Sequence, residues 1–193
     1  VLIATETQET RDLLRILVDV FKAAGDDTAI LTPANFSLTS DKSGVTSLLD
    51  SVASQLHRDL RENALRNLEA VKNGVPAEQV PHLEPILSAL WLRSLSLENH
   101  AGAEPSELQL DITESKVIDD NLFSAELAVI EDNSFNIHRQ ANRLVFKNEV
   151  NPQAKLLAHA KNDKLFQNDE DVEHLAKEIR YALVGDGNQS NIY

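Results

Sequence analysis

The sequence predicts a mainly helical fold with one small β-hairpin, on three observations. Apolar residues recur at spacings of three and four along most of the chain, which is the period of a helix with one buried face. Glycine, proline and polar residues interrupt these stretches at helix-length intervals. Between residues 135 and 146 the pattern changes to alternation, which is typical of two short strands.

The first predicted helix covers residues 7–24 and stops at Gly25, a residue type that commonly ends helices. Its predicted apolar stripe consists of Leu13, Leu14, Leu17, Val20, Phe21 and Ala24. A turn and a short element follow over residues 32–38. The second predicted helix covers residues 45–72. Its stripe includes Leu48, Leu49, Val52, Leu56, Leu60, Ala64, Leu68 and Val71.

The next segments predict three helices in a row. Residues 75–81 contain two prolines and are the best candidate for a domain boundary. A helix is then predicted from about residue 84, with Pro85 where proline costs least. A short helix opens at Pro105, and a longer one, capped by Thr113 or Ser115, runs to residue 132.

The hairpin comes after these helices. Its first strand places Phe135, Ile137 and Arg139 on one face and His138 on the other. A connection of three to four residues leads to the second strand, residues 144–146. Two further helices are predicted, one from Asn151-Pro152 and one over residues 169–183.

The composition is that of a globular protein, with 193 residues of which 42% are hydrophobic and 25% charged. Cysteine is absent, which excludes disulfides and suits a cytoplasmic location. No apolar run is long enough to span a membrane, so no membrane partner is expected. Methionine is also absent, from which we expect the chain to be a piece of a longer protein.

The net charge of −13 bears on the choice of partner. The chain has 18 Lys and Arg residues against 31 Asp and Glu residues. Such a balance repels DNA and anionic lipid at long range and aids solubility. Any contact with nucleic acid would need a local basic patch.

Several segments resemble a known family. Residues 84–147 are predicted in the order helix, helix, helix, hairpin, which is the winged-helix arrangement. Thr10–Leu17, with Ile30–Pro33 and Phe36–Leu38, resembles the lid helix of a family of large bacterial and archaeal AAA+-type ATPases. The ATPase domain of that family is of unknown function, and its members are often encoded in phage-defence gene clusters. Leu90–Leu95 resembles the first helix, and residues 135–151 resemble the wing, of the winged-helix segment that follows the lid in that family. The order is also similar to that of archaeal origin-initiator ATPases.

The resemblance implies a lid-like segment over residues 1–74 and a winged-helix domain over 75–165. The sequence pattern predicts a C-terminal helix with a frayed tail over residues 166–193. The resemblance also implies that Arg11, with Arg15 as the alternative, contacts the γ-phosphate of ATP. This chain has no Gly-x-x-x-x-Gly-Lys-Ser/Thr loop and no acidic strand end for magnesium. We therefore expect no catalysis and no cofactor here, and ATP and magnesium in the parent protein only.

The hairpin carries the candidate contact residues. His138, Arg139, Arg143 and Lys147 lie in a stretch, 134–148, that has no acidic residue. The predicted recognition helix, residues 115–132, instead carries one lysine against five acidic residues and would be repelled by DNA phosphates. We therefore expect the wing to contact a protein or a neighbouring domain, and DNA contact through the wing is disfavoured.

These observations predict a non-catalytic regulatory and interaction part of a larger ATPase, whose first partner is the N-terminal ATPase core of the same protein. The alternative is a stand-alone winged-helix module that binds DNA or regulates transcription. A zinc site is disfavoured because the six histidines never pair at helical spacing. Asp111 with Glu114 and Lys116 is similar to a nuclease pattern, but acidic residues at a helix start are ordinary, and we favour that interpretation.

Overall fold

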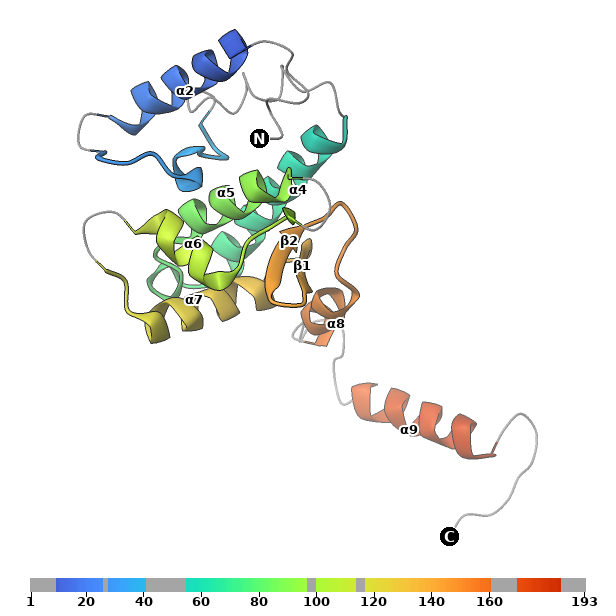
Figure 1. The fold of residues 1–193 in the computed structure, drawn as a ribbon. Helices are drawn as coiled ribbons and strands as arrows, with labels where there is room; N and C mark the ends of the chain where they lie inside the picture. The colour runs from blue at the N-terminus through green and yellow to red at the C-terminus, as the bar shows by residue number, and fades with distance from the viewer. Residues whose placement is uncertain are drawn as a thin grey trace. The chain divides into compact units, whose positions relative to one another are not determined.

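The computed structural model describes residues 10–25, 28–40, 55–96, 100–113, 117–160 and 170–184. Over these ranges the chain forms seven α-helices, two short 3-10 turns and one two-stranded antiparallel sheet (Figure 1). The prediction of a mainly helical fold with a small β-hairpin is confirmed. Contacts divide the chain into two units, residues 1–155 and 156–193.

The elements follow the predicted order. The helices, 3-10 turns and strands are α2 (Thr10–Ala24), η1 (Pro33–Asn35), α4 (Gln55–Gly74), η2 (Ala77–Gln79), α5 (Leu83–Ser94), α6 (Pro105–Ile112), α7 (Asp120–Asp132), β1 (Ile137–Gln140), β2 (Arg143–Phe146), α8 (Pro152–Ala160) and α9 (Glu170–Val184). Residues 7–9 of the first predicted helix and 45–54 of the second lie outside the described residues.

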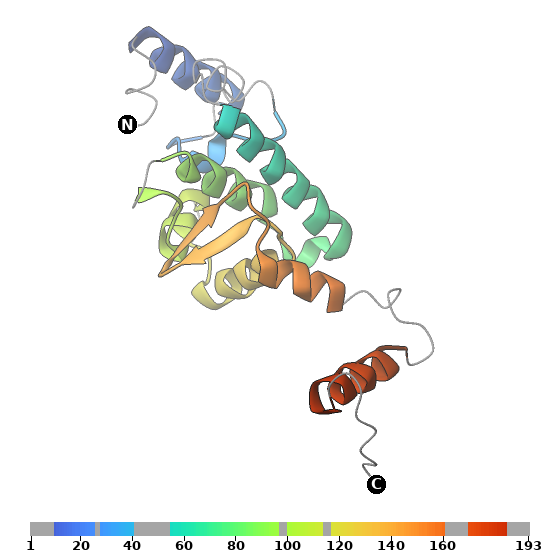
Figure 2. The same ribbon diagram turned by 90° about the vertical axis from the view of Figure 1, so that its right-hand side faces the viewer.

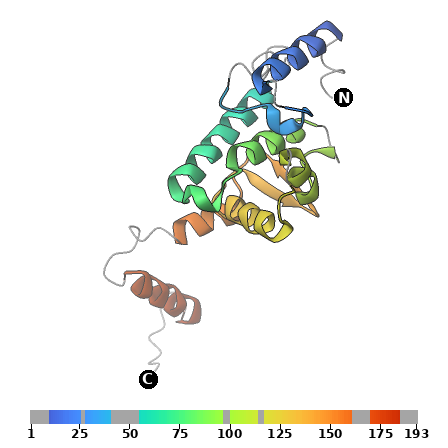
Figure 3. The ribbon, with the colours of Figure 1, turned by 90° about the vertical axis from the view of Figure 1, so that its left-hand side faces the viewer.

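Helix α5 is the centre of the first unit. It is buried along most of its length, and its side chains Ile86, Leu87, Leu90 and Trp91 have no exposed surface. It contacts η1, α4, α6 and β2. Figure 2 faces the hairpin, with α4 beside it, and Figure 3 views the same unit from the other side.

The predicted lid and winged-helix segments share this core. Leu60, Ala64, Leu68 and Val71 of α4 belong to the same buried cluster as the α5 side chains, although the predicted boundary after residue 74 separates α4 from α5. The contact-based division falls between residues 155 and 156 instead. The functional distinction between residues 1–74 and 75–165 stays a prediction.

Helix α2 ends as predicted, with Gly25 at a φ of +80° directly after it. Its buried side differs from the predicted stripe. Ile16 and Val20 are buried in the core together with Phe36 and Leu38, whereas Leu14, Leu17 and Phe21 are exposed. The apolar surface of α2 therefore extends beyond the side of the helix that packs on the core, and Leu14, Leu17 and Phe21 lie outside that contact.

Helix α7 begins later than predicted, so the prediction of a recognition helix over 115–132 was wrong at its start. The Asp119 side chain accepts hydrogen bonds from the backbone N–H groups of Asn121 and Leu122, which caps the first turn. Thr113, a predicted cap, ends α6 instead, and Ser115 lies outside the described residues.

The hairpin connection is shorter than predicted. Gln140 pairs with Arg143, so the turn consists of the two residues Ala141 and Asn142 rather than three or four. Ala141 adopts a φ of +52°, a conformation that tight two-residue hairpin turns require.

A third extended segment pairs with the hairpin. Ala103 and Leu144 form an antiparallel bridge through two backbone hydrogen bonds of 2.9 and 2.8 Å. The preceding residue, Gly102, has a φ of +78°, and a Cβ atom there would lie 2.0 Å from the Leu144 carbonyl oxygen. Only glycine allows the chain to approach β2 this closely.

Two helices follow the hairpin. Asn151 caps α8 by accepting a hydrogen bond from the Gln153 N–H. In the second unit, the described side chains of α9, residues 172–181, are all exposed, and they include Val172, Leu175 and Ile179. None of the helices within the described ranges combines the length and apolar character needed to cross a membrane.

Candidate functional site

The four predicted contact residues of the hairpin have different environments. The Arg139 guanidinium forms a two-point ion pair with the Glu131 carboxylate at the end of α7. His138 Nε2 lies 2.9 Å from the Glu149 carbonyl oxygen. Among the described residues, the Lys147 side chain forms no hydrogen bond or ion pair. Lys147 is therefore the cation of this group that stays available to an outside partner.

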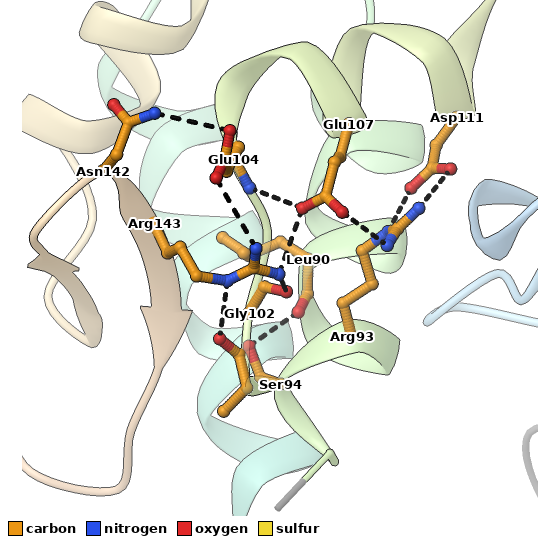
Figure 4. A network of polar contacts seen from close by, with 10 residues as sticks. Leu90, Arg93, Ser94, Gly102, Glu104, Glu107, Asp111, Asn142 and Arg143 are labelled. Carbon is orange, nitrogen blue, oxygen red and sulfur yellow. Dashed lines mark hydrogen bonds and ion pairs between the residues drawn. The ribbon is translucent and has the colours of Figure 1, made fainter. Parts of the chain in front are cut away.

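Arg143 points into the protein rather than away from it (Figure 4). Its Nη2 donates to the Gly102 carbonyl oxygen at 2.7 Å, and its Nε donates to the Ala101 carbonyl oxygen at 3.3 Å. Two carboxylates neutralise its charge. The nearest oxygens lie 3.0 Å away on Glu107 and 3.9 Å away on Glu104. Arg143 thus holds the 101–104 segment beside β2.

These contacts weaken the basic character that the sequence assigns to the wing. The charges of Arg139 and Arg143 are each balanced by a carboxylate of the same chain. A phosphate backbone would have to compete with those carboxylates for both guanidinium groups. The predicted set of four contact residues therefore splits into two that are paired internally and two, His138 and Lys147, with no carboxylate partner among the described residues.

The Arg143 contacts belong to a larger charged network that also includes Arg93, on α5 (Figure 4). Arg93 binds the Asp111 carboxylate at two points, Nε to Oδ2 at 2.6 Å and Nη2 to Oδ1 at 2.9 Å. Its Nη1 lies 3.6 Å from Glu107 Oε1. Glu107 therefore stands between two arginines from different elements, Arg93 of α5 and Arg143 of β2.

The start of α6 places Glu107 in this position. Pro105 opens the helix, and the Glu107 carboxylate reaches back to accept a hydrogen bond from the Glu104 N–H at 2.8 Å. One carboxylate therefore caps α6 and pairs with both arginines. On the hairpin side, Asn142 donates to Glu104 at 3.4 Å.

The network keeps Glu107 and Arg93 charged. The hydrogen bond from the Glu104 N–H lowers the pKa of Glu107, burial opposes this, and the charges of Arg143 and Arg93 lower it further. The hydrogen bonds with Asp111 raise the pKa of Arg93, against the effect of burial, and the Asp111 and Glu107 charges act in the same direction as the hydrogen bonds. Glu107 and Arg93 are therefore both charged at neutral pH.

Residues 28–40 are attached to this network and to α5. Thr32 Oγ1 donates to the Asp111 carbonyl oxygen at 2.6 Å. Ser37 and Thr39 both donate to Glu84 Oε1, at 2.7 and 2.5 Å, and the Leu38 N–H donates to Ser88 Oγ. The segment that follows α2 is therefore bound to α5 and α6 through side chains.

A second polar cluster connects α4 with the start of the hairpin. Asn67 is fully buried, and its Oδ1 accepts hydrogen bonds from the N–H groups of Phe135 and Asn136. Its Nδ2 donates to Asn63 O at 2.6 Å and to Asn136 Oδ1 at 2.9 Å. This one amide satisfies two backbone donors and fixes the entry of the chain into β1.

The predicted nucleotide-sensing residues are not tested by these contacts. Arg11 and Arg15 belong to α2, and their side chains lie outside the part of the chain that the structure describes. Their predicted contact with ATP stays a prediction.

The nuclease-like pattern is not assembled in the described residues. Both carboxylate oxygens of Asp111 are bound by Arg93, while Glu114 and Lys116 lie outside those residues. Within the described ranges, no group of three or more His, Asp or Glu side chains is placed to hold a metal ion.

Sequence reasoning named Arg143 and Asp111 but missed the other residues of the charged network and the buried Asn67. Arg93 could have been noticed as the only charge in the second half of a helix that is otherwise almost wholly apolar. Asn67 could have been noticed as an amide directly beside Leu68 of the predicted buried stripe. Nothing in the sequence indicates that Glu107 pairs with Arg143.

Comparisons with protein-family models, with curated proteins and with solved structures found no match for this chain. The resemblance to AAA+-type ATPases therefore rests on the sequence segments alone.

Proposed function

We propose that this chain is a non-catalytic regulatory and interaction part of a larger AAA+-type ATPase, in which α2 belongs to a lid and residues 75–165 form a winged-helix module. The order of elements supports the module. It reads α5, an extended residue at Ala103, α6, α7, β1 and β2, with β2 paired on one side to β1 and on the other to Ala103. This is the order of helices and strands in a winged helix.

The observation that carries the proposal is the outer face of α2. Leu14, Leu17, Val18 and Phe21 recur at helical spacing, and between 41% and 58% of each side chain is exposed. A row of large apolar side chains on a helix surface is typical of a contact with another domain or protein. The partner we propose is the N-terminal ATPase core of the parent protein.

The chemistry of α7 favours a protein partner over DNA for the winged-helix module. The exposed residues of this helix are Asp120, Asn121, Leu122, Ser124, Ala125, Ala128 and Asp132. They include no cation, and a helix that reads the major groove faces phosphates on both sides. The stand-alone DNA-binding alternative has no supporting contact among the described residues.

A first experiment tests the contact proposed for α2. The reading frame upstream of this chain should encode a phosphate-binding loop, and that upstream portion, produced separately, should bind the chain. Val18→Asp should abolish this binding because it places a charge in the apolar contact. Val172→Asp, at a similarly exposed valine of α9, should leave it intact.

Each outcome tests a different part of the proposal. An upstream frame without a phosphate-binding loop would overturn the ATPase assignment. Equal loss of binding in Val18→Asp and Val172→Asp would overturn the contact through α2. In the full-length protein, Arg11→Ala should reduce ATP turnover if Arg11 senses the γ-phosphate, whereas Lys22→Ala in the same helix should not.

A further inference from the structure

The charged network has two ends on parts of the chain that are far apart in sequence. At one end, Thr32 of the segment 28–40 donates to the backbone carbonyl of Asp111. At the other end, Arg143 of β2 is held by Glu107 and itself binds the Gly102 carbonyl oxygen. Between them, Arg93 contacts both Asp111 and Glu107.

From this geometry we propose that the chain Thr32–Asp111–Arg93–Glu107–Arg143 couples the contact of Thr32 with α6 to the pairing of the hairpin with Ala103. When Thr32 leaves α6, Asp111 and Arg93 shift, and Glu107 loosens its hold on Arg143. The bridge between Ala103 and Leu144 then opens more often. This coupling is a property of the chain itself, and its role in passing lid motion to a winged helix rests on the proposed function.

The sharing of groups makes the coupling strong. The Asp111 backbone carbonyl accepts a hydrogen bond from Thr32, and its carboxylate accepts hydrogen bonds from Arg93. The single Arg93 guanidinium in turn contacts the carboxylates of both Asp111 and Glu107. Only 5% of the Asp111 side chain and 27% of the Arg93 side chain are exposed, so water compensates a broken contact poorly. A change at one member therefore alters the contacts of the next.

The contacts at the hairpin end of the charged network are equally well defined. Arg143 donates to the carbonyl oxygens of Ala101 and Gly102, the two residues before the bridge. The Ala103 N–H then donates to Leu144 at 2.9 Å, and the Leu144 N–H donates back at 2.8 Å. These two amides report directly on whether the edge of the hairpin is closed.

The same segment offers an internal control. Ser37 holds it on α5 through Glu84, and among the described residues neither of the two forms a hydrogen bond or ion pair with Arg93 or Glu107. Removing the Ser37 hydroxyl should weaken the attachment of the segment to α5 while the contact of Thr32 with α6 remains.

The test is a mutant cycle read by amide hydrogen exchange on the whole 193-residue chain. Thr32→Val, which removes the hydroxyl but keeps the side-chain shape, should speed exchange of the Ala103 and Leu144 amides relative to the Val75 amide, which donates to Val71 of α4. We expect a change of about threefold or more, the size found for groups in one network. Thr32→Ser, which keeps a hydroxyl, should show the wild-type exchange rates. Ser37→Ala should leave unchanged the ratio of the Ala103 and Leu144 exchange rates to the Val75 rate.

The decisive arm repeats Thr32→Val in chains that carry Arg93→Lys or, separately, Glu107→Gln. If the network transmits the change, Thr32→Val has no further effect on the ratio in either background. The same threefold change in those backgrounds, or an equal change from Ser37→Ala, would overturn the proposal. The experiment contains no nucleotide and no ATPase core, so a negative result overturns the coupling but not the proposed function. Likewise, a failure to bind the ATPase core would overturn the proposed function but not the coupling.

Discussion

Arg93 and Asp111 face each other across α5 and α6 and are joined by two hydrogen bonds of 2.6 and 2.9 Å. The pairing is the two-point geometry that favours arginine over lysine at a carboxylate. Because only 5% of the Asp111 side chain is exposed, this carboxylate depends on Arg93 for its charge balance.

Loss of Arg93 should therefore destabilise the protein strongly. Arg93→Met leaves the buried Asp111 carboxylate without its partner and should lower the free energy of unfolding by about 3 kcal/mol. Urea denaturation measures the change. Arg66→Met, which removes the exposed pair of Arg66 with Glu62, should cost less than about 1 kcal/mol. Similar losses in the two variants would mean that burial of the pair is unimportant.

Glu84 should make stability sensitive to acid. Burial raises the pKa of Glu84, but hydrogen bonds from Thr39 and Ser37 and the charge of Lys72 together bring it below its ordinary value of 4.5. A carboxyl with a lowered folded-state pKa contributes stability above its unfolded pKa and loses it as pH falls through the folded pKa. Stability measured from about pH 5 to about pH 3 should therefore fall less steeply in Glu84→Gln than in the wild type.

The hydroxyl donors provide the control for this pH effect. The double variant Ser37→Ala, Thr39→Ala keeps the Glu84 carboxyl but removes the two hydrogen bonds that lower its pKa. It should flatten the same part of the pH profile. A profile identical to the wild type would show that these hydroxyls do not stabilise the ionised form.

Gly102 should not tolerate a side chain. Gly102→Ala forces a Cβ to within 2.0 Å of the Leu144 carbonyl oxygen at a φ of +78°, so it should cost more than about 1 kcal/mol in the free energy of unfolding. Gly74→Ala is the matched control. Nothing lies within 4 Å of a Cβ at Gly74, and alanine favours the helix there, so this variant should be neutral or slightly stabilising. Thermal denaturation compares the two.

Asn67 should be needed for the entry into β1. Asn67→Leu leaves the partly buried N–H of Phe135 and the buried N–H of Asn136 without their acceptor, and should cost about 2 kcal/mol or more. Asn63→Leu removes a single hydrogen bond to Asn148 and should cost less. Hydrogen exchange at Phe135 and Asn136 distinguishes local loss of the acceptor from a general loss of stability.

The hairpin should not bind duplex DNA tightly. Arg139 and Arg143 are paired with carboxylates of the chain, and the net charge is −13. Fluorescence anisotropy at low salt should show no salt-sensitive binding, and Lys147→Ala should not change the signal. Tight binding that is lost in the double variant Arg139→Ala, Arg143→Ala would instead favour the DNA-binding alternative.

The helices were predictable because their signals are local. Gly25, Pro105 and Asn151 mark helix ends by their own backbone and capping chemistry, and each does so in the structure. The start of α7 was not predictable in this way, since Thr113, Ser115 and Asp119 are all good capping residues. Tertiary contacts favour Asp119, because the Gln109 side chain binds Ile118 and Asp120 just beside it.

The candidate site was less predictable because its contacts are not local. The charges on the hairpin were identified correctly, but their partners depend on which elements meet in the folded chain. Arg143 meets Glu107 only because Ala103 pairs with Leu144, and Arg93 meets Asp111 only because α5 packs on α6. Two of the four cationic candidates, Arg139 and Arg143, thus form ion pairs within the chain, and they are less suited to binding an outside anion.

The Ala103 bridge has a consequence for how this protein meets other chains. An exposed strand edge invites pairing with a strand from a second molecule. Here the outer edge of β2 is occupied by Ala103, and the Ile137 carbonyl of β1 already accepts a hydrogen bond from the Asn151 side chain. The outer edge of β2 is therefore closed to strand addition at Leu144, so a partner that recognises this side of the hairpin must do so through side chains.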